Sequence, residues 1–171
     1  MMEKLLELLR RTLNDFLGSK GLGTDHVVIS NIRDRDGRVV LAKDKIALVL
    51  INMVQERMIS SLPNRRTGPN PAHADPALHI DLLVLFFANF QGEHYVQGLN
   101  MISETISCFQ QTPVITRANA PDLPNSIDRL ALEYTSLNFS ELADVMRMLG
   151  ANYLPSACYR VRMLPFASGQ S

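Results

Sequence analysis

One segment, residues 45–55, constrains the fold more than any other part of the sequence. It reads Lys-Ile-Ala-Leu-Val-Leu-Ile-Asn-Met-Val-Gln and is apolar at odd and even positions alike for most of its length. Side chains of a strand alternate between two faces, so a strand that is apolar on both faces must be covered on both. We therefore expect this segment to lie in the middle of a sheet. Residues 79–90 form a second long, apolar strand candidate.

Two amphipathic helices are predicted, one before these strands in the sequence and one after them. Residues 1–17 carry apolar residues at helical spacing and are followed by three glycines, which predicts an N-terminal helix. The second helix begins near His94, carries an apolar stripe and ends near Gln110 or Gln111, because Pro113 cannot continue it. The stripe consists of Tyr95, Leu99, Ile102, Ile106 and Phe109, and we expect it to be buried against the neighbouring apolar segments. Gly98 lies inside this helix, where glycine costs about 1 kcal/mol relative to alanine. A close approach of another backbone is one interpretation, and a tolerated glycine without a role is the other.

Shorter signals complete the pattern. Strands are predicted at residues 27–32, 114–116, 127–134 and 157–164. Asn138 and Glu141 form a capping-box pattern at the start of a third helix, which Gly150 closes. This order predicts an α+β fold: a single domain with a mixed, largely antiparallel sheet and helices packed over one face.

The chain has the size of one domain, and we expect residues 1–171 to form one. Residues 63–76 contain four prolines and no apolar period, which predicts a long loop, and we expect a flexible C-terminus over about 166–171. The 17 basic and 17 acidic residues cancel, so there is no long-range attraction to nucleic acid or to an anionic membrane. We see no signal peptide or membrane-spanning segment, so we expect folding in the cytoplasm.

One group of residues could hold a metal ion: His73, Asp75, His79 and Asp81. A metal site needs three or four such groups that converge and are held in place. Because two of the four lie on the predicted loop, a solvated loop and strand start is the better interpretation, with a small metal-binding or ligand-binding domain as the alternative.

Nothing in the sequence predicts an enzyme. Cys108 and Cys158 have no histidine or other base nearby in the sequence, and both are expected to be buried, reduced thiols. There is no phosphate-binding loop, nucleophile elbow or dinucleotide fingerprint. We expect no catalytic residue, no metal and no cofactor.

Clustered arginines are the candidate contact residues. Arg65 and Arg66 lie in the predicted loop, Arg57 precedes it, and Arg160 and Arg162 share one face of the last strand. A solvated surface is the default interpretation, and a protein interface comes second because arginine is enriched at interfaces.

The order of apolar segments resembles a known family. The residues that carry this resemblance are 45–53, 80–86, 102–114, 142–149 and 153–161, the last reading Tyr-Leu-Pro-Ser-Ala-Cys-Tyr-Arg-Val. They resemble the tail-terminator, or tube-cap, proteins of contractile injection systems, which include phage-tail-like particles of the antifeeding-prophage type and related type VI-like secretion systems.

The resemblance covers about residues 27–166 and implies a structural role. Such a protein forms a ring, expected to be a hexamer, on the distal end of the inner tube and the last sheath layer, where it stops polymerisation and couples tube to sheath. The implied partners are other copies of the chain, the tube protein and the sheath protein, with assembly in the bacterial cytoplasm. An assembly adaptor or chaperone of the same apparatus is the alternative. In the terminator interpretation, replacing Arg160 and Arg162 with glutamate weakens assembly while leaving the fold intact.

Overall fold

The computed structural model describes residues 1–31, 33–38, 40–55 and 80–164. Its elements, in chain order, are α1 (Met2–Ser19), β1 (Val27–Ile29), β2 (Lys45–Gln55), β3 (Ile80–Asn89), the 3-10 turn η1 (Gly92–His94), α2 (Tyr95–Gln111), β4 (Val114–Thr116), β5 (Arg129–Tyr134), α3 (Phe139–Leu149) and β6 (Ser156–Leu164). The predicted helices and strands are confirmed, with bounds within a few residues of those expected.

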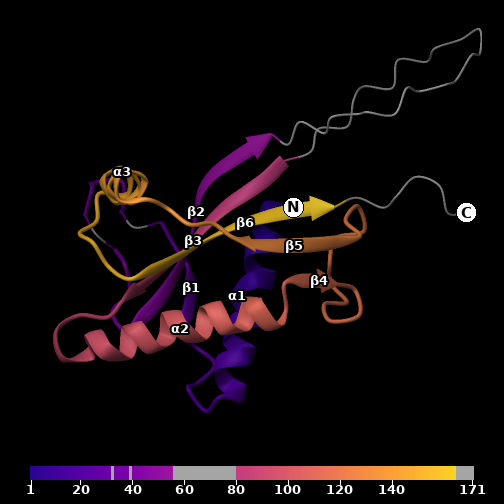
Figure 1. The fold of residues 1–171 in the computed structure, drawn as a ribbon, viewed down its shortest axis with the longest axis horizontal. Coiled ribbons are helices and arrows are strands. Elements are labelled where there is room, and N and C mark those ends of the chain that lie inside the picture. The colour runs from indigo at the N-terminus through magenta and orange to yellow at the C-terminus, as the bar shows by residue number, and fades with distance from the viewer. Residues whose placement is uncertain (32, 39, 56–79, 165–171) are drawn as a thin grey trace, which may run out of the picture.

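Within the described residues, the strands form one six-stranded sheet in the order β1-β2-β3-β6-β5-β4 (Figure 1). Only β1 and β2 are parallel, and the other neighbours are antiparallel. The expected α+β domain with a mixed, largely antiparallel sheet is therefore confirmed. The most central apolar strand is β3, between β2 and β6, while β2 lies second from the edge.

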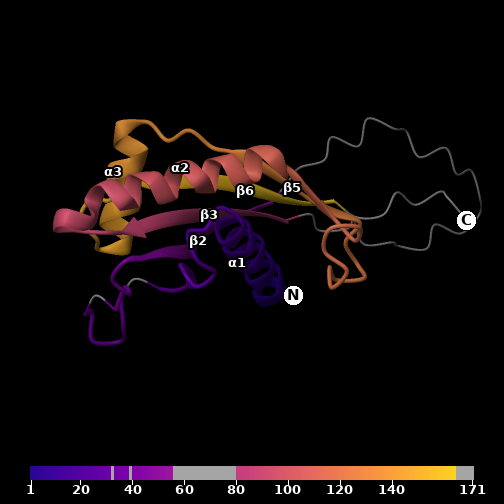
Figure 2. The same cartoon turned by 90° about the horizontal axis from the view of Figure 1, so that it is seen from below.

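One face of the sheet is covered by α1 and α2, which are steeply inclined to each other (Figures 1 and 2). The leucines of α1 and one side of α2 pack there against alternate residues of the strands. Phe86, Phe109 and Tyr159 join β3, α2 and β6, with ring centroids 5.2 to 5.9 Å apart. Tilted and edge-on aromatic contacts of this kind add to the burial of their area. The larger core lies on this face.

The third helix does not lie in the same layer as α1 and α2, although all helices were expected over one face of the sheet. Helix α3 packs on the opposite face, where Met146 contacts a cluster that includes Leu85, Phe87 and Cys158. Figure 1 shows α2 and α3 on opposite sides of β3 and β6. The physical reason is that β3 is apolar at odd positions as well as even ones, so its second face also needs a cover.

Helix α2 is rotated about its axis relative to the predicted stripe. Tyr95 and Leu99 are 42% and 41% exposed, so the prediction that they are buried was wrong. The buried residues of α2 are Gly98, Met101, Ile102, Thr105, Cys108 and Phe109. A Cβ atom on Gly98 would lie 2.7 Å from the Cβ of Phe90. The missing side chain therefore lets the helix approach Phe90, and this contact sets the rotation.

A buried polar residue holds β1 in place. The side-chain oxygen of Asn14, on α1, accepts hydrogen bonds from the backbone N–H groups of His26 and Val27, each at 3.0 Å. Its amide nitrogen donates to the carbonyl of Val27 at 3.2 Å. Because one buried side chain satisfies three backbone groups, α1 fixes the start of this short strand.

Replacing Gly98 with alanine tests the close approach. Alanine is the better helix former by about 1 kcal/mol, but its Cβ overlaps Phe90, and overpacking costs about 1–3 kcal/mol. We expect a net loss of stability in urea unfolding. Gln97→Ala, at the neighbouring exposed position, is the matched control and should be neutral or slightly stabilising. Equal effects of the two substitutions would contradict the role of Gly98.

Candidate functional site

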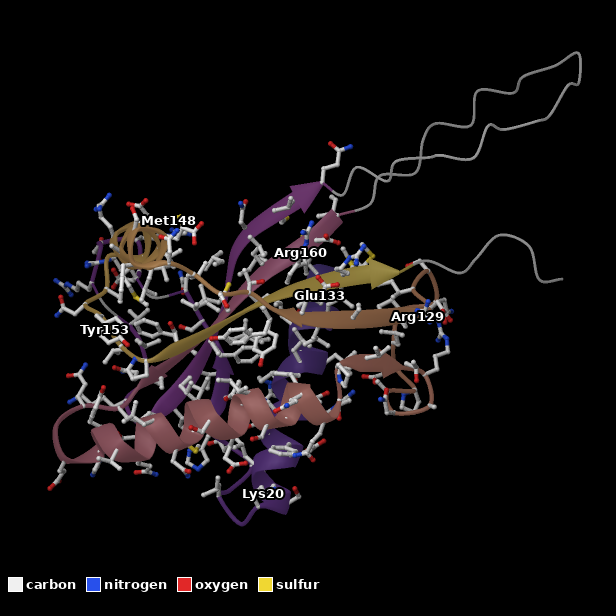
Figure 3. All side chains as sticks on the ribbon, viewed as in Figure 1. Lys20, Arg129, Glu133, Met148, Tyr153 and Arg160 are labelled. Carbon is white, nitrogen blue, oxygen red and sulfur yellow. The ribbon has the colours of Figure 1, made fainter. Side chains whose placement is uncertain are left out.

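Charged residues gather on the part of the second sheet face that α3 leaves open. Residues Leu82 and Val161 point to the larger core, so their neighbours in sequence point to this face. The residues that form it, called the ionic face below, are Asp81 of β3, Arg129 and Glu133 of β5, and Arg160 and Arg162 of β6. Figure 3 shows Arg160 and Glu133 beside each other over β6 and β5, and Arg129 at the start of β5.

A buried ion pair lies at the centre of the ionic face. Asp81 is 1% exposed, and one of its carboxylate oxygens accepts a hydrogen bond from Nε of Arg160 at 2.7 Å. A buried carboxylate is costly unless it is paired and hydrogen-bonded. The side chain of Arg160 is 37% exposed, so it neutralises Asp81 on one side and reaches solvent on the other.

A second ion pair connects the neighbouring strands. Nη1 of Arg162 donates to a carboxylate oxygen of Glu133 at 3.1 Å. Arg162 lies opposite Asp81 on β3 and Ala131 on β5, so positive and negative groups alternate across three strands. Arg129 continues the row and approaches Asp128 to 4.0 Å. The ionic face is thus a mixed array of charges and not the basic surface that the two arginines alone indicated.

An apolar groove lies beside the ionic face, between α3 and the sheet. This α3 groove has a volume of about 450 Å³. Its apolar lining comprises Ile51, Leu83, Leu137, Val145, Met148 and Cys158. Glu141 and Asp144 of α3 also line it. An apolar groove bordered by paired charges is suited to contact with another protein surface.

The structure places only some of the predicted site residues. Arg160 and Arg162 lie together on the ionic face, whereas Arg57, Arg65 and Arg66 are outside the described residues and remain predictions. Asp81 and Glu133, which pair with Arg160 and Arg162, were not predicted as their partners.

Of the four residues considered for a metal site, only Asp81 lies in the described part of the chain. Its carboxylate is bound to Arg160 instead of pointing to solvent, so the expectation of a solvated strand start was wrong for this residue. Among the described residues, no group of three or more histidine, cysteine, aspartate or glutamate side chains could hold a metal ion.

Both cysteines are buried free thiols, as expected. Burial raises the pKa of Cys108 to about 12 and that of Cys158 to about 11. The thiolate is the nucleophilic form, so neither group is activated for catalysis.

A separate polar cluster joins the start of β2 to the start of α2. Nδ1 of His94 lies 3.0 Å from a carboxylate oxygen of Asp44. The backbone N–H of Asp44 donates to the carbonyl of Asn89 at 2.8 Å. The Asn89 amide donates in turn to the carbonyls of Leu41 and Ala42. The hydrogen bond with Asp44 raises the pKa of His94 above its usual value of 6.5. These hydrogen bonds hold the residues that precede β2 against the end of β3 and the start of α2.

Comparison with known proteins identifies the family. A family model described as the Pvc16 N-terminal domain matches residues 4–171. The chain belongs to the Pvc16 N-terminal domain family. Together with the solved structure described next, this match confirms the resemblance to the terminator proteins of contractile injection systems. No curated protein matches the chain.

A solved structure shares the fold of this Pvc16 N-terminal domain. It is the PVC sheath/tube terminator of an extracellular contractile injection system, solved by cryo-electron microscopy in the extended state, with a TM-score of 0.54 and 15% sequence identity over 93% of the present chain. The present chain spans 56% of the length of that terminator. None of the helices described for this family member is both long and apolar enough to cross a bilayer.

Removing Arg160 tests the buried pair in this Pvc16 N-terminal domain. Breaking a buried ion pair typically costs 3–5 kcal/mol because a charge is left without a partner. We expect Arg160→Ala to cost about 2–3 kcal/mol, since the partly exposed arginine site admits water. Combining Asp81→Asn with Arg160→Ala should recover part of that loss in urea unfolding, and additive losses would contradict the pairing. The expectation that replacing Arg160 and Arg162 with glutamate leaves the fold intact is therefore revised, because this change also removes the partner of Asp81.

The His94 cluster predicts a pH dependence. Because the folded pKa of His94 is raised, its contribution to stability is fully present below about pH 6.5, provided Asp44 is ionised, and is lost as the pH rises through the raised pKa. Thermal unfolding of wild type and His94→Gln between pH 5.5 and 8.5 measures this. The difference in Tm should be largest at the acidic end, and a difference independent of pH would contradict the ion pair.

Proposed function

We propose that this protein is a structural terminator of a contractile injection system. The observation that carries the proposal is the match of its fold, over 93% of the chain, to the PVC sheath/tube terminator. Membership in the Pvc16 N-terminal domain family supports it independently. In this proposal the protein caps the distal end of the inner tube and the last sheath layer, stops polymerisation and couples tube to sheath, without catalysing a reaction.

The proposed assembly is a ring of identical subunits, expected to be a hexamer. A ring subunit needs one contact that repeats around the axis and another for the tube or sheath. The ionic face and the α3 groove are adjacent and together offer paired charges beside apolar area, as protein interfaces do. We assign this combined surface to the tube or sheath. Assembly in the bacterial cytoplasm, followed by incorporation into the particle, is part of the same proposal.

Particle length tests the proposed role. In a strain that lacks the protein, tubes and sheaths should be irregular in length under the electron microscope, and expression of this chain, or of a longer protein that contains it, should restore uniform ends. An adaptor or chaperone predicts instead that the protein is absent from finished particles. Detecting it at one end of each particle by antibody labelling supports the terminator, and its absence from purified particles contradicts it.

A charge reversal tests the surface assigned to the tube or sheath. Arg129 is 55% exposed on the ionic face, so Arg129→Glu changes the charge without burying it. We expect this variant to fold normally but to lose most of its binding to tube ends in co-sedimentation. Lys4→Glu, at an exposed position of α1 on the other side of the sheet, is the matched control and should bind normally. Equal binding by both variants would contradict the assignment.

A further inference from the structure

Arg160 uses only part of its guanidinium group within the fold. Its Nε atom donates to Asp81 at 2.7 Å, and neither Nη atom has a hydrogen bond with another of the residues that the structure describes. The Nη atoms of a guanidinium carry most of its N–H donors. Because the Arg160 side chain is 37% exposed, these donors are available at the surface of the described part of the chain.

The buried pair with Asp81 also restricts where these donors lie. A surface arginine normally loses rotamer freedom when it binds a partner, and this loss weakens binding. In Arg160 the hydrogen bond from Nε to the buried carboxylate already limits that freedom. The paired N–H donors at the end of a guanidinium match the two oxygens of a carboxylate. Arg160 is therefore preorganised to bind a second carboxylate.

Apolar residues of the α3 groove adjoin Arg160. Leu83 lies directly opposite Arg160 in the pairing of β3 with β6, and the Cβ atoms of residues opposite each other are about 4.5–5.5 Å apart. Cys158, two residues before Arg160 on β6, projects to the same face. Both Leu83 and Cys158 line the groove. One short segment of a partner can therefore place a carboxylate on Arg160 and an apolar side chain in the groove.

The charges of the ionic face favour an added carboxylate. This face carries three arginines but two carboxylates, those of Asp81 and Glu133, and each carboxylate is paired with an arginine. Asp128, beside the face, approaches Arg129 only to 4.0 Å, the limit of an ion pair. A carboxylate from a partner would therefore balance the charge of the ionic face, as complementary protein surfaces do.

The α3 side of the groove has the opposite preference. The carboxylates of Glu141 and Asp144 line the groove there, and like charges brought together at an interface are unfavourable. A segment that binds across the groove is therefore acidic at the end over Arg160 and neutral or basic at the end beside α3, with an apolar side chain between the two ends.

We infer that Arg160 and the α3 groove together bind a segment of the tube or sheath protein in which an acidic side chain adjoins an apolar one. The acidic side chain accepts hydrogen bonds from the Nη atoms of Arg160, and the apolar side chain enters the groove beside Leu83 and Met148. This inference rests on the proposed terminator function and names the chemistry that the partner presents to the surface assigned to it.

Arg160→Lys tests the guanidinium contact. Lysine keeps a positive charge beside Asp81, so the fold should persist in urea unfolding, but its single nitrogen cannot hold Asp81 and also present paired donors. We expect the Kd for tubes or sheaths in co-sedimentation to rise roughly tenfold or more. Arg10→Lys is the matched control, because Nε of Arg10, on α1, also donates to a carboxylate, that of Glu7. Equal binding by the two variants would overturn the inference.

Met148→Ser tests the apolar half of the site. Met148 is exposed and lines the groove, so the change removes a contact for the partner without opening the core. Phe139→Ser, at an almost fully exposed position of the same helix outside the groove lining, is the matched control. We expect binding to weaken for Met148→Ser and not for Phe139→Ser. Unchanged binding by Met148→Ser would overturn the inference.

Blocking the partner's carboxylates tests the contact without changing this chain. Purified tubes and purified sheaths are treated separately with a carbodiimide and ethanolamine, which convert exposed carboxylates into neutral amides, and are mixed with the wild-type chain. Binding should fall for whichever of the two presents the segment. Undiminished binding after treatment would overturn the inference and leave the terminator proposal intact. A wild-type chain that binds neither untreated tubes nor untreated sheaths would contradict both.

Discussion

The burial of β3 on both faces is the constraint on which the other elements depend. One face of this strand requires the layer made by α1 and α2, and the other requires α3. Helix α3 is too short to cover the whole second face, since it has 11 residues and packs near one end of the strands. The uncovered part carries Asp81 and its arginine partner instead. The same constraint thus produces both the core and the surface assigned to binding.

Local patterns were sufficient to locate the elements but not to orient all of them. The capping box of Asn138 and Glu141 and the left-handed Gly150 define α3 by interactions within a few residues, and both were readable in the sequence. The rotation of α2 was not, because its apolar residues occupy more than one side of the helix. The decisive contact, between Gly98 and Phe90, depends on how the helix meets a neighbouring segment.

The candidate site was predicted only in part, because its contacts also depend on how distant segments meet. The alternation of the last strand placed Arg160 and Arg162 on one face, as observed. Their partners could not be identified, because Asp81 is 79 residues from Arg160 in the sequence and meets it only through the register of β3 with β6. An acidic residue in an apolar strand is the available signal, since such a group must find a counter-charge. Asp81 could have been interpreted in that way.

The two buried thiols have a consequence for the durability of the protein. With pKa values of about 12 and 11, only about one Cys158 group in ten thousand is ionised at neutral pH, and fewer Cys108 groups are. Oxidants and disulfides react with the ionised form. Both sulfur atoms should therefore stay reduced during long exposure to oxygen, and the folded chain would keep its shape in an oxidising medium without any cross-link.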